Sequence, residues 1–320
     1  MAREKTNGEW RVANGAAWHV PFAIRHSLLA LASLVFSISA SAQVQFATIA
    51  ARPALWTVHS TGATVYLFGS VHLLPANVRW HTPEIDRAMA ASSTFVFEAP
   101  LDEAGKAAVA DFVRRNGMLP QGTTLRSLLP KKTLGDYERA LAVTNLTPAL
   151  LDGERPWLAS IVIDVSYLQQ MRYVVADGVD QQVYAYAVAH DKSVRNFETP
   201  EQQLSLFMPK SRALEIAEFD TDLKEFQSEQ ASIGAMVDAW GDGDAKTVGR
   251  IVNKELDSVP GVRKILLDDR NKAWIRTLDR MLTGHGTYFV TVGTGHLVGA
   301  KGVPALLRAQ RYRVDGPPTR

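Results

Sequence analysis

Two histidines stand in nearly the same sequence surroundings at opposite ends of the chain. The first lies in Thr64-Val-Tyr-Leu-Phe-Gly-Ser-Val-His-Leu-Leu-Pro75, and the second lies in Tyr288-Phe-Val-Thr-Val-Gly-Thr-Gly-His-Leu297. Each apolar run is rich in Val, Phe and Tyr and ends at a glycine, which predicts a buried strand followed by a sharp turn. His72 and His296 are therefore expected just past strand ends. Ligands bind at that edge of open α/β sheets, so both histidines could serve one site.

Two glutamates occupy the same kind of position. Glu98 directly follows a predicted strand over 93–97, and Glu198 follows another over 192–197. A helix over 83–91 joins the first histidine's strand to the strand before Glu98. A strand, helix, strand unit makes two parallel neighbours, which would place Glu98 beside His72. A surface carboxylate at a strand exit is the alternative interpretation for both residues.

This set of side chains suggests metal chemistry. Two imidazoles with one or two carboxylates and no cysteine suit Zn, Mn, Co or Fe, with an open position for water. Such a site would hydrolyse an amide or ester, with Glu98 or Glu198 as ligand or general base. His72 and His296 could instead only hydrogen-bond their own turns. The chain has no His-Glu-x-x-His helix, no Gly-x-Ser-x-Gly elbow and no phosphate-binding loop.

The remaining pattern predicts a mixed α/β fold. Strands over 54–58 and 64–68 form an antiparallel pair, and the central mixed sheet is built from two βαβ-like halves separated by a large helical insertion. Helices are expected over 102–116, 124–129, 134–143, 148–171, 177–189 and 298–308, and a last strand over 312–314. Another helix, leading toward the second histidine, carries Arg270 and Asn271, which could simply form its solvent-exposed face.

The first 42 residues differ from the rest of the 320. An apolar run over 28–38 precedes Ala40-Ser-Ala42, which predicts a cleaved signal peptide and a periplasmic or secreted protein that begins at Gln43, with a retained amphiphilic anchor as the alternative. No second hydrophobic span follows, so stable membrane insertion is not expected after cleavage. That segment holds four of the 35 basic and two of the 33 acidic residues, so the mature chain is formally neutral. Neutrality without a basic patch argues against nucleic acid as a partner.

Several of these segments, taken together, resemble a known family. They are Leu67-Phe-Gly-Ser-Val-His-Leu-Leu-Pro75, Phe97-Glu98, Gly178-Val-Asp180, Glu198-Thr-Pro-Glu-Gln202, Arg270-Asn271, and Gly293-Thr-Gly-His-Leu-Val-Gly299 with Gly302. As a set and in this order, they resemble the TraB/GumN family, over a single domain within 43–320. That family is similar to the Tiki proteins, which are membrane-associated metal-dependent proteases. Its wider fold relatives include erythromycin esterases and haem-iron-binding ChaN-like proteins.

The resemblance implies roles for particular residues. It implies that His72, Glu98 and His296 bind a divalent metal such as Mn, Co or Zn, with Arg270 and Asn271 near a peptide or small-molecule substrate. Two classes of function stay open. One is an exported metal-dependent hydrolase, in particular a peptidase. The other is an accessory protein that binds a metal, haem or peptide in the same cleft without turnover.

Overall fold

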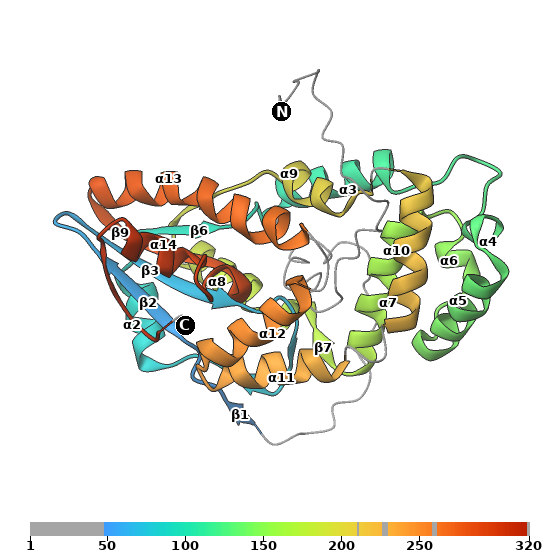
Figure 1. The fold of residues 1–320 in the computed structure, drawn as a ribbon. Coiled ribbons are helices and arrows are strands. Elements are labelled where there is room, and N and C mark those ends of the chain that lie inside the picture. Colours follow the sequence, from blue (N-terminus) through green and yellow to red (C-terminus); the bar gives the residue numbers. More distant parts are fainter. Residues whose placement is uncertain (1–47, 210, 226–229, 258–260, 319–320) are drawn as a thin grey trace, which may run out of the picture.

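A six-stranded mixed sheet organises the molecule (Figure 1). The computed structural model describes residues 48–209, 211–225, 230–257 and 261–318. The strand order is β10-β2-β3-β9-β6-β8, in which β3, β9, β6 and β8 run parallel and β2 and β10 are antiparallel to their neighbours. The strands span Leu55–His59 (β2), Ala63–Ser70 (β3), Thr94–Phe97 (β6), Ser193–Asn196 (β8), Gly286–Gly293 (β9) and Arg313–Asp315 (β10). The predicted mixed α/β class is confirmed.

Two short ladders tie down the chain around the first histidine. Strand β4 (Leu74–Pro75) pairs antiparallel with β7 (Tyr173–Val174), and β5 (Val78–Arg79) pairs parallel with β1 (Ile49–Ala50). Because β4 begins two residues after His72, the turn that carries this histidine is fixed at both ends.

The predicted neighbour relation between the first two parallel strands is wrong. Strand β9 lies between β3 and β6, with Ser70 opposite Gly293 on one side and Phe97 opposite Thr291 on the other. Strand β9 can take this central place because it buries apolar side chains on both faces, among them Phe289 and Val290. Both Gly-x-x-His segments therefore leave adjacent strands, and the Glu98 segment leaves the strand beyond them.

Helices surround the sheet and fill the interval between β6 and β9. They are α2 (Pro83–Ala91), α3 (Glu103–Asn116), α4 (Leu125–Leu128), α5 (Lys131–Thr144), α6 (Pro148–Leu151), α7 (Pro156–Gln170), α8 (Val179–Ala189), α9 (Pro200–Leu204), α10 (Arg212–Glu225), α11 (Gln230–Gly241), α12 (Ala245–Asp257), α13 (Asp269–Thr283) and α14 (Val303–Ala309). Single turns of 3₁₀ helix cover Val175–Asp177, Ser205–Phe207 and Thr294–His296, and a π-helical turn covers Lys264–Asp268. Helices α4 to α7 and α10 gather beside the sheet, at the right of Figure 1.

Two predicted helices are shorter than the sequence suggested. The helix expected over 148–171 is divided into α6 and α7, because Arg155 is extended before Pro156, as residues that precede proline prefer. The helix expected over 298–308 begins at Val303, since Gly302 is extended and Pro304 stands in the first turn.

The described part of the chain contains no helix long and apolar enough to cross a membrane. The signal peptide predicted over 1–42 lies outside the described residues.

Candidate functional site

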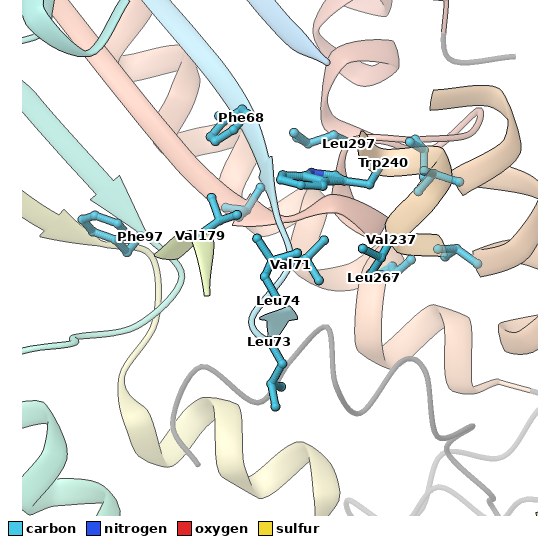
Figure 2. Close-up of a cluster of buried hydrophobic side chains, with 14 of the residues drawn as sticks. Phe68, Val71, Leu73, Leu74, Phe97, Val179, Val237, Trp240, Leu267 and Leu297 are labelled. Atoms are coloured by element: carbon cyan, nitrogen blue, oxygen red, sulfur yellow. The ribbon is translucent and has the colours of Figure 1, made fainter. Parts of the chain in front are cut away.

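The turn that carries His72 is anchored by its apolar neighbours. Figure 2 shows Val71, Leu73 and Leu74 within a cluster of buried hydrophobic side chains that also contains Leu297, from the second Gly-x-x-His segment. Trp240 belongs to the same cluster, and its indole N–H donates to the Gly69 carbonyl over 2.8 Å. The two histidine segments thus share one piece of core, which fixes their backbones relative to each other.

His72 is buried and is held by a carboxylate. Its Nδ1 hydrogen-bonds Oδ2 of Asp180, near the start of α8, and both side chains are buried. The backbone fixes this contact, because the Val179 N–H donates to the Val71 carbonyl over 3.0 Å. Only glycine fits at position 178, where a Cβ would lie 2.1 Å from the His72 carbonyl oxygen. Asp180 is thereby placed against the imidazole.

His296 is buried as well, but its partners differ. Its Nδ1 lies 2.6 Å from Oδ1 of Asn271, whose amide nitrogen donates to the Lys301 carbonyl over 2.9 Å. The Oδ1 atom can only accept, so Nδ1 of His296 carries the proton and Nε2 carries the lone pair. Nη1 of Arg270 lies 2.9 Å from that Nε2, and the Trp274 ring centroid lies 4.3 Å from the imidazole centroid.

Arg270 contacts most of the polar groups around His296, and we call Arg270 with Glu98 and Glu198 the arginine hub. Its Nε and Nη2 donate to the two oxygens of Glu198 over 2.8 and 2.9 Å, and Nη2 also donates to Oε2 of Glu98 over 2.5 Å. Nη1 donates to the Leu266 carbonyl over 3.1 Å. The interpretation of Arg270 and Asn271 as a solvent-exposed helix face is therefore wrong, because both are buried. The apolar face of α13 extends to include them.

The charge of this arginine is balanced by the two carboxylates. Burial acts to lower the pKa of Arg270, but Glu98 and Glu198 outweigh it and leave the pKa above its ordinary value. A buried guanidinium is stable only when its charge and its N–H groups are satisfied. Here five contacts on three nitrogens meet that condition, so Arg270 is a permanent cation inside the site.

Glu98 lies beside His296, just past the end of the strand next to β9. Its Oε1 accepts from the Gly293 N–H over 2.6 Å and lies 3.8 Å from Nε2 of His296. Its Oε2 accepts from the side-chain amide of Gln203 over 2.8 Å as well as from Arg270. The cause is the strand order, because β6 is hydrogen-bonded to β9 and not to β3.

Glu198 also enters this group. Its backbone N–H donates to the Glu98 carbonyl over 2.8 Å, which continues the β6–β8 ladder past the strand ends. Its side chain accepts from Arg270 and, over 3.0 Å, from the indole N–H of Trp274. The helix that follows is capped as expected, by a capping box between Thr199 and Gln202. Glu198 is thus one of the arginine's two counter-charges rather than an exposed carboxylate.

The electrostatics of the site keep one imidazole neutral. Burial, the positive charge of Arg270 and the neighbouring His72 together hold the pKa of His296 well below 6.5. A neutral imidazole is the form that binds metal ions.

The donors fit a divalent cation in part. A ligating histidine usually gives its second N–H to an oxygen acceptor, and His72 and His296 both have such an acceptor at Nδ1, in Asp180 and Asn271. Glu98 and His296 fit less well, since each oxygen of Glu98 already accepts a hydrogen bond and Nε2 of His296 faces Nη1 of Arg270. Within the described ranges, no three His, Asp or Glu side chains are grouped so as to hold a metal. The metal set of His72, Glu98 and His296 stays a prediction.

Three residues in this network were not predicted as site residues from the sequence. Asp180 holds His72, Gln203 donates to Glu98, and Trp274 contacts both Glu198 and His296. Asp180 stood in the Gly-Val-Asp segment that carries the family resemblance, which was the available signal. Gln203 follows the capping residue Gln202 on the opposite, buried side of a short helix, and no local pattern distinguishes it.

Comparison with known proteins identifies the class of this chain. The model of the TraB/PrgY/gumN family matches residues 54–316, which include the whole sheet and all six predicted site residues. The chain belongs to the TraB/PrgY/gumN family. Searches of the curated proteins and of the solved structures gave no match.

Proposed function

We propose that this protein is a metal-dependent hydrolase and that its substrate is a peptide. The observation that carries the proposal is the matched support of the two imidazoles. Each has an oxygen acceptor at Nδ1, which makes Nε2 the metal-binding atom of His296, where a metal takes the place of the Arg270 contact, and, by the same tautomer, of His72. A purely structural histidine needs no such matching partners on two separate helices.

In this proposal His72 and His296 hold the metal, and Glu98 is the adjacent carboxylate, 3.8 Å from His296. A bound Mn, Co or Zn ion supplies Lewis-acid activation of water and of a carbonyl group. Asp180 and Asn271 orient the two imidazoles. Nη1 of Arg270 lies 2.9 Å from Nε2 of His296, so its N–H can donate to a group that gains negative charge during hydrolysis.

Calorimetric titration of the metal-free protein with Mn, Co and Zn tests the site. His72→Ala and His296→Ala are each expected to weaken binding by at least about 100-fold, because loss of one of few ligands removes most of the affinity. His190→Ala is the matched control, because His190 is an exposed histidine at the far end of α8. It should bind metal as the wild-type protein does.

Circular dichroism of each variant must show the wild-type spectrum, and His296→Gln replaces His296→Ala if it does not. Unchanged metal affinity in both histidine variants would refute the metal site. A peptide-library cleavage assay with each metal, run beside the His296→Ala protein, tests the reaction itself. Metal binding without any cleavage would favour the accessory, non-catalytic alternative.

We also propose that the protein is exported. The support is the apolar run over 28–38 followed by Ala40-Ser-Ala42. The mature protein is expected to begin at Gln43. Amino-terminal sequencing of the exported protein checks this, and an amino terminus upstream of Leu28 would contradict it.

A further inference from the structure

A cleft of about 550 Å³ lies against the outer side of the arginine hub. Its walls come from the segment after β8, from the π-helical turn and from α13. Glu198, Arg270 and Trp274 all contribute to its lining, so the cleft is in direct contact with the network around His296. Whatever occupies the cleft therefore touches residues that belong to the proposed site.

The charges of the cleft do not cancel. Glu198 is paired with Arg270, which it shares with Glu98, and Asp269 is paired with Lys264. Arg276 and Arg280 also line the cleft, one helical turn apart on α13, and both are exposed. Within the described ranges the side chain of Arg276 makes no hydrogen bond or ion pair, and that of Arg280 donates only to the Thr277 hydroxyl over 3.0 Å.

Two like charges at this spacing on a helix disfavour each other, so the pair is better accommodated next to an anion. A guanidinium matches a carboxylate particularly well, because its N–H groups form a planar fork. The cleft thus offers two arginines without a carboxylate partner in the described chain, in a concave setting rather than on a convex surface.

Apart from Gln202 and Thr277, the rest of the lining is apolar. Phe197 stacks on Trp274 with ring centroids 4.9 Å apart and planes inclined by 14°. Leu206 and Ile265, both half-buried, extend this surface. A ligand that fits the cleft therefore combines an apolar side chain with a negative charge.

We propose that this cleft binds a peptide segment in which a carboxylate side chain lies next to an apolar one. The carboxylate pairs with Arg276 and Arg280, and the apolar side chain packs on Phe197 and Trp274. The inference rests on the proposed function and specifies its substrate class, namely acidic peptides.

Binding of two labelled peptides to the metal-free protein tests the proposal. The probes are fluorescein-labelled Ala-Phe-Glu-Leu-Glu-Ala and the same peptide with Gln in place of both Glu residues, and fluorescence anisotropy gives their dissociation constants. The acidic probe is expected to bind about tenfold more tightly at low salt, since each exposed ion pair contributes about threefold. In 1 M NaCl the preference should disappear.

Substitutions locate the effect. Arg276→Gln and Arg280→Gln should each weaken binding of the acidic probe about threefold and the double variant about tenfold, with the neutral probe unaffected. Arg87→Gln, at an exposed arginine of α2 outside the cleft lining, is the matched control and should change neither constant. Equal affinity for the two probes, or an equal loss in the Arg87→Gln protein, would overturn the inference. Because no metal is present, these outcomes are independent of whether the protein hydrolyses peptides.

Discussion

The two Gly-x-x-His segments are alike in sequence and unlike in surroundings. Both follow adjacent parallel strands, and both histidines are buried with an oxygen acceptor at Nδ1. At His72 the acceptor is the carboxylate of Asp180, whereas at His296 it is the amide of Asn271. At His296 a cation, Arg270, also lies within hydrogen-bonding distance, with Nη1 2.9 Å from Nε2.

The difference shows how one repeated motif can supply two kinds of imidazole. An anionic partner raises the basicity of a ring and makes it a stronger metal donor. At His296, burial, the guanidinium of Arg270 and the neighbouring His72 hold the pKa of the ring well below 6.5. The first histidine is thus hydrogen-bonded to a carboxylate, whereas the second is held neutral beside a buried guanidinium.

The largest expected effect is a loss of stability when Arg270, beside His296, is replaced. Arg270→Gln should lower the free energy of unfolding by about 3–5 kcal/mol, because Glu98 and Glu198 would then be buried without their counter-charge. Urea unfolding measures this. Arg276→Gln, on the exposed face of the same helix, should change it by less than about 0.5 kcal/mol.

The same variant also tests whether the two histidines are independent of each other. In nitrogen-15 spectra of the folded protein, Arg270→Gln should shift the ring nitrogens of His296 much more than those of His72. Shifts of equal size at both rings would show that the two segments form one electrostatic unit, and the contrast between them would not hold.

The next largest effect is expected on metal affinity, when the residues that hydrogen-bond the two histidines are exchanged between acid and amide. Asp180→Asn keeps the size of the side chain but removes the negative charge, so metal affinity should fall about 10–100-fold. Asn271→Asp adds a charge at the corresponding place and should not produce such a loss. Calorimetry with Mn, Co and Zn measures both. If Asp180→Asn binds metal as the wild-type protein does, Asp180 has only a structural role.

The sequence alone identified the two histidines but not which side chains lie beside each of them. Strand, glycine and histidine recur at short range, so His72 and His296 could be recognised from local pattern. Glu98 was expected beside His72 because consecutive strands often pair, but β9, nearly 200 residues later in the chain, is inserted between them. Local pattern carries no information about such an insertion.

The arginine hub illustrates the same limit. Arg270 and Asn271 looked like the polar side of an amphipathic helix, because a charged residue and an amide are usually exposed there. They are buried because Glu98, Glu198 and the His296 segment, all distant in sequence, cover that side of α13. Only the assembled sheet edge brings these partners together.

The smallest expected effect is a change in the pH dependence of stability, caused by a buried glutamate that titrates near neutral pH. Glu154, between α6 and α7, is buried, and burial raises its pKa to about 8. Its Oε2 has no hydrogen-bond partner in the described part of the chain. Since its pKa in the unfolded chain is near 4.5, the folded protein keeps a proton that the unfolded chain releases. This contribution to stability is fully present below about pH 4.5 and is lost as the pH rises through about 8.

Between pH 6 and pH 7 the free energy of unfolding should therefore fall by about 1 kcal/mol because of Glu154 alone. Glu154→Gln, which is neutral at every pH, should remove this slope, as urea unfolding at both pH values would show. In that background, any remaining pH dependence near neutrality belongs to other groups, and the two histidines can be compared directly. Equal slopes in the wild-type and Glu154→Gln proteins would mean that Glu154 is ionised when folded, with a partner that neutralises it.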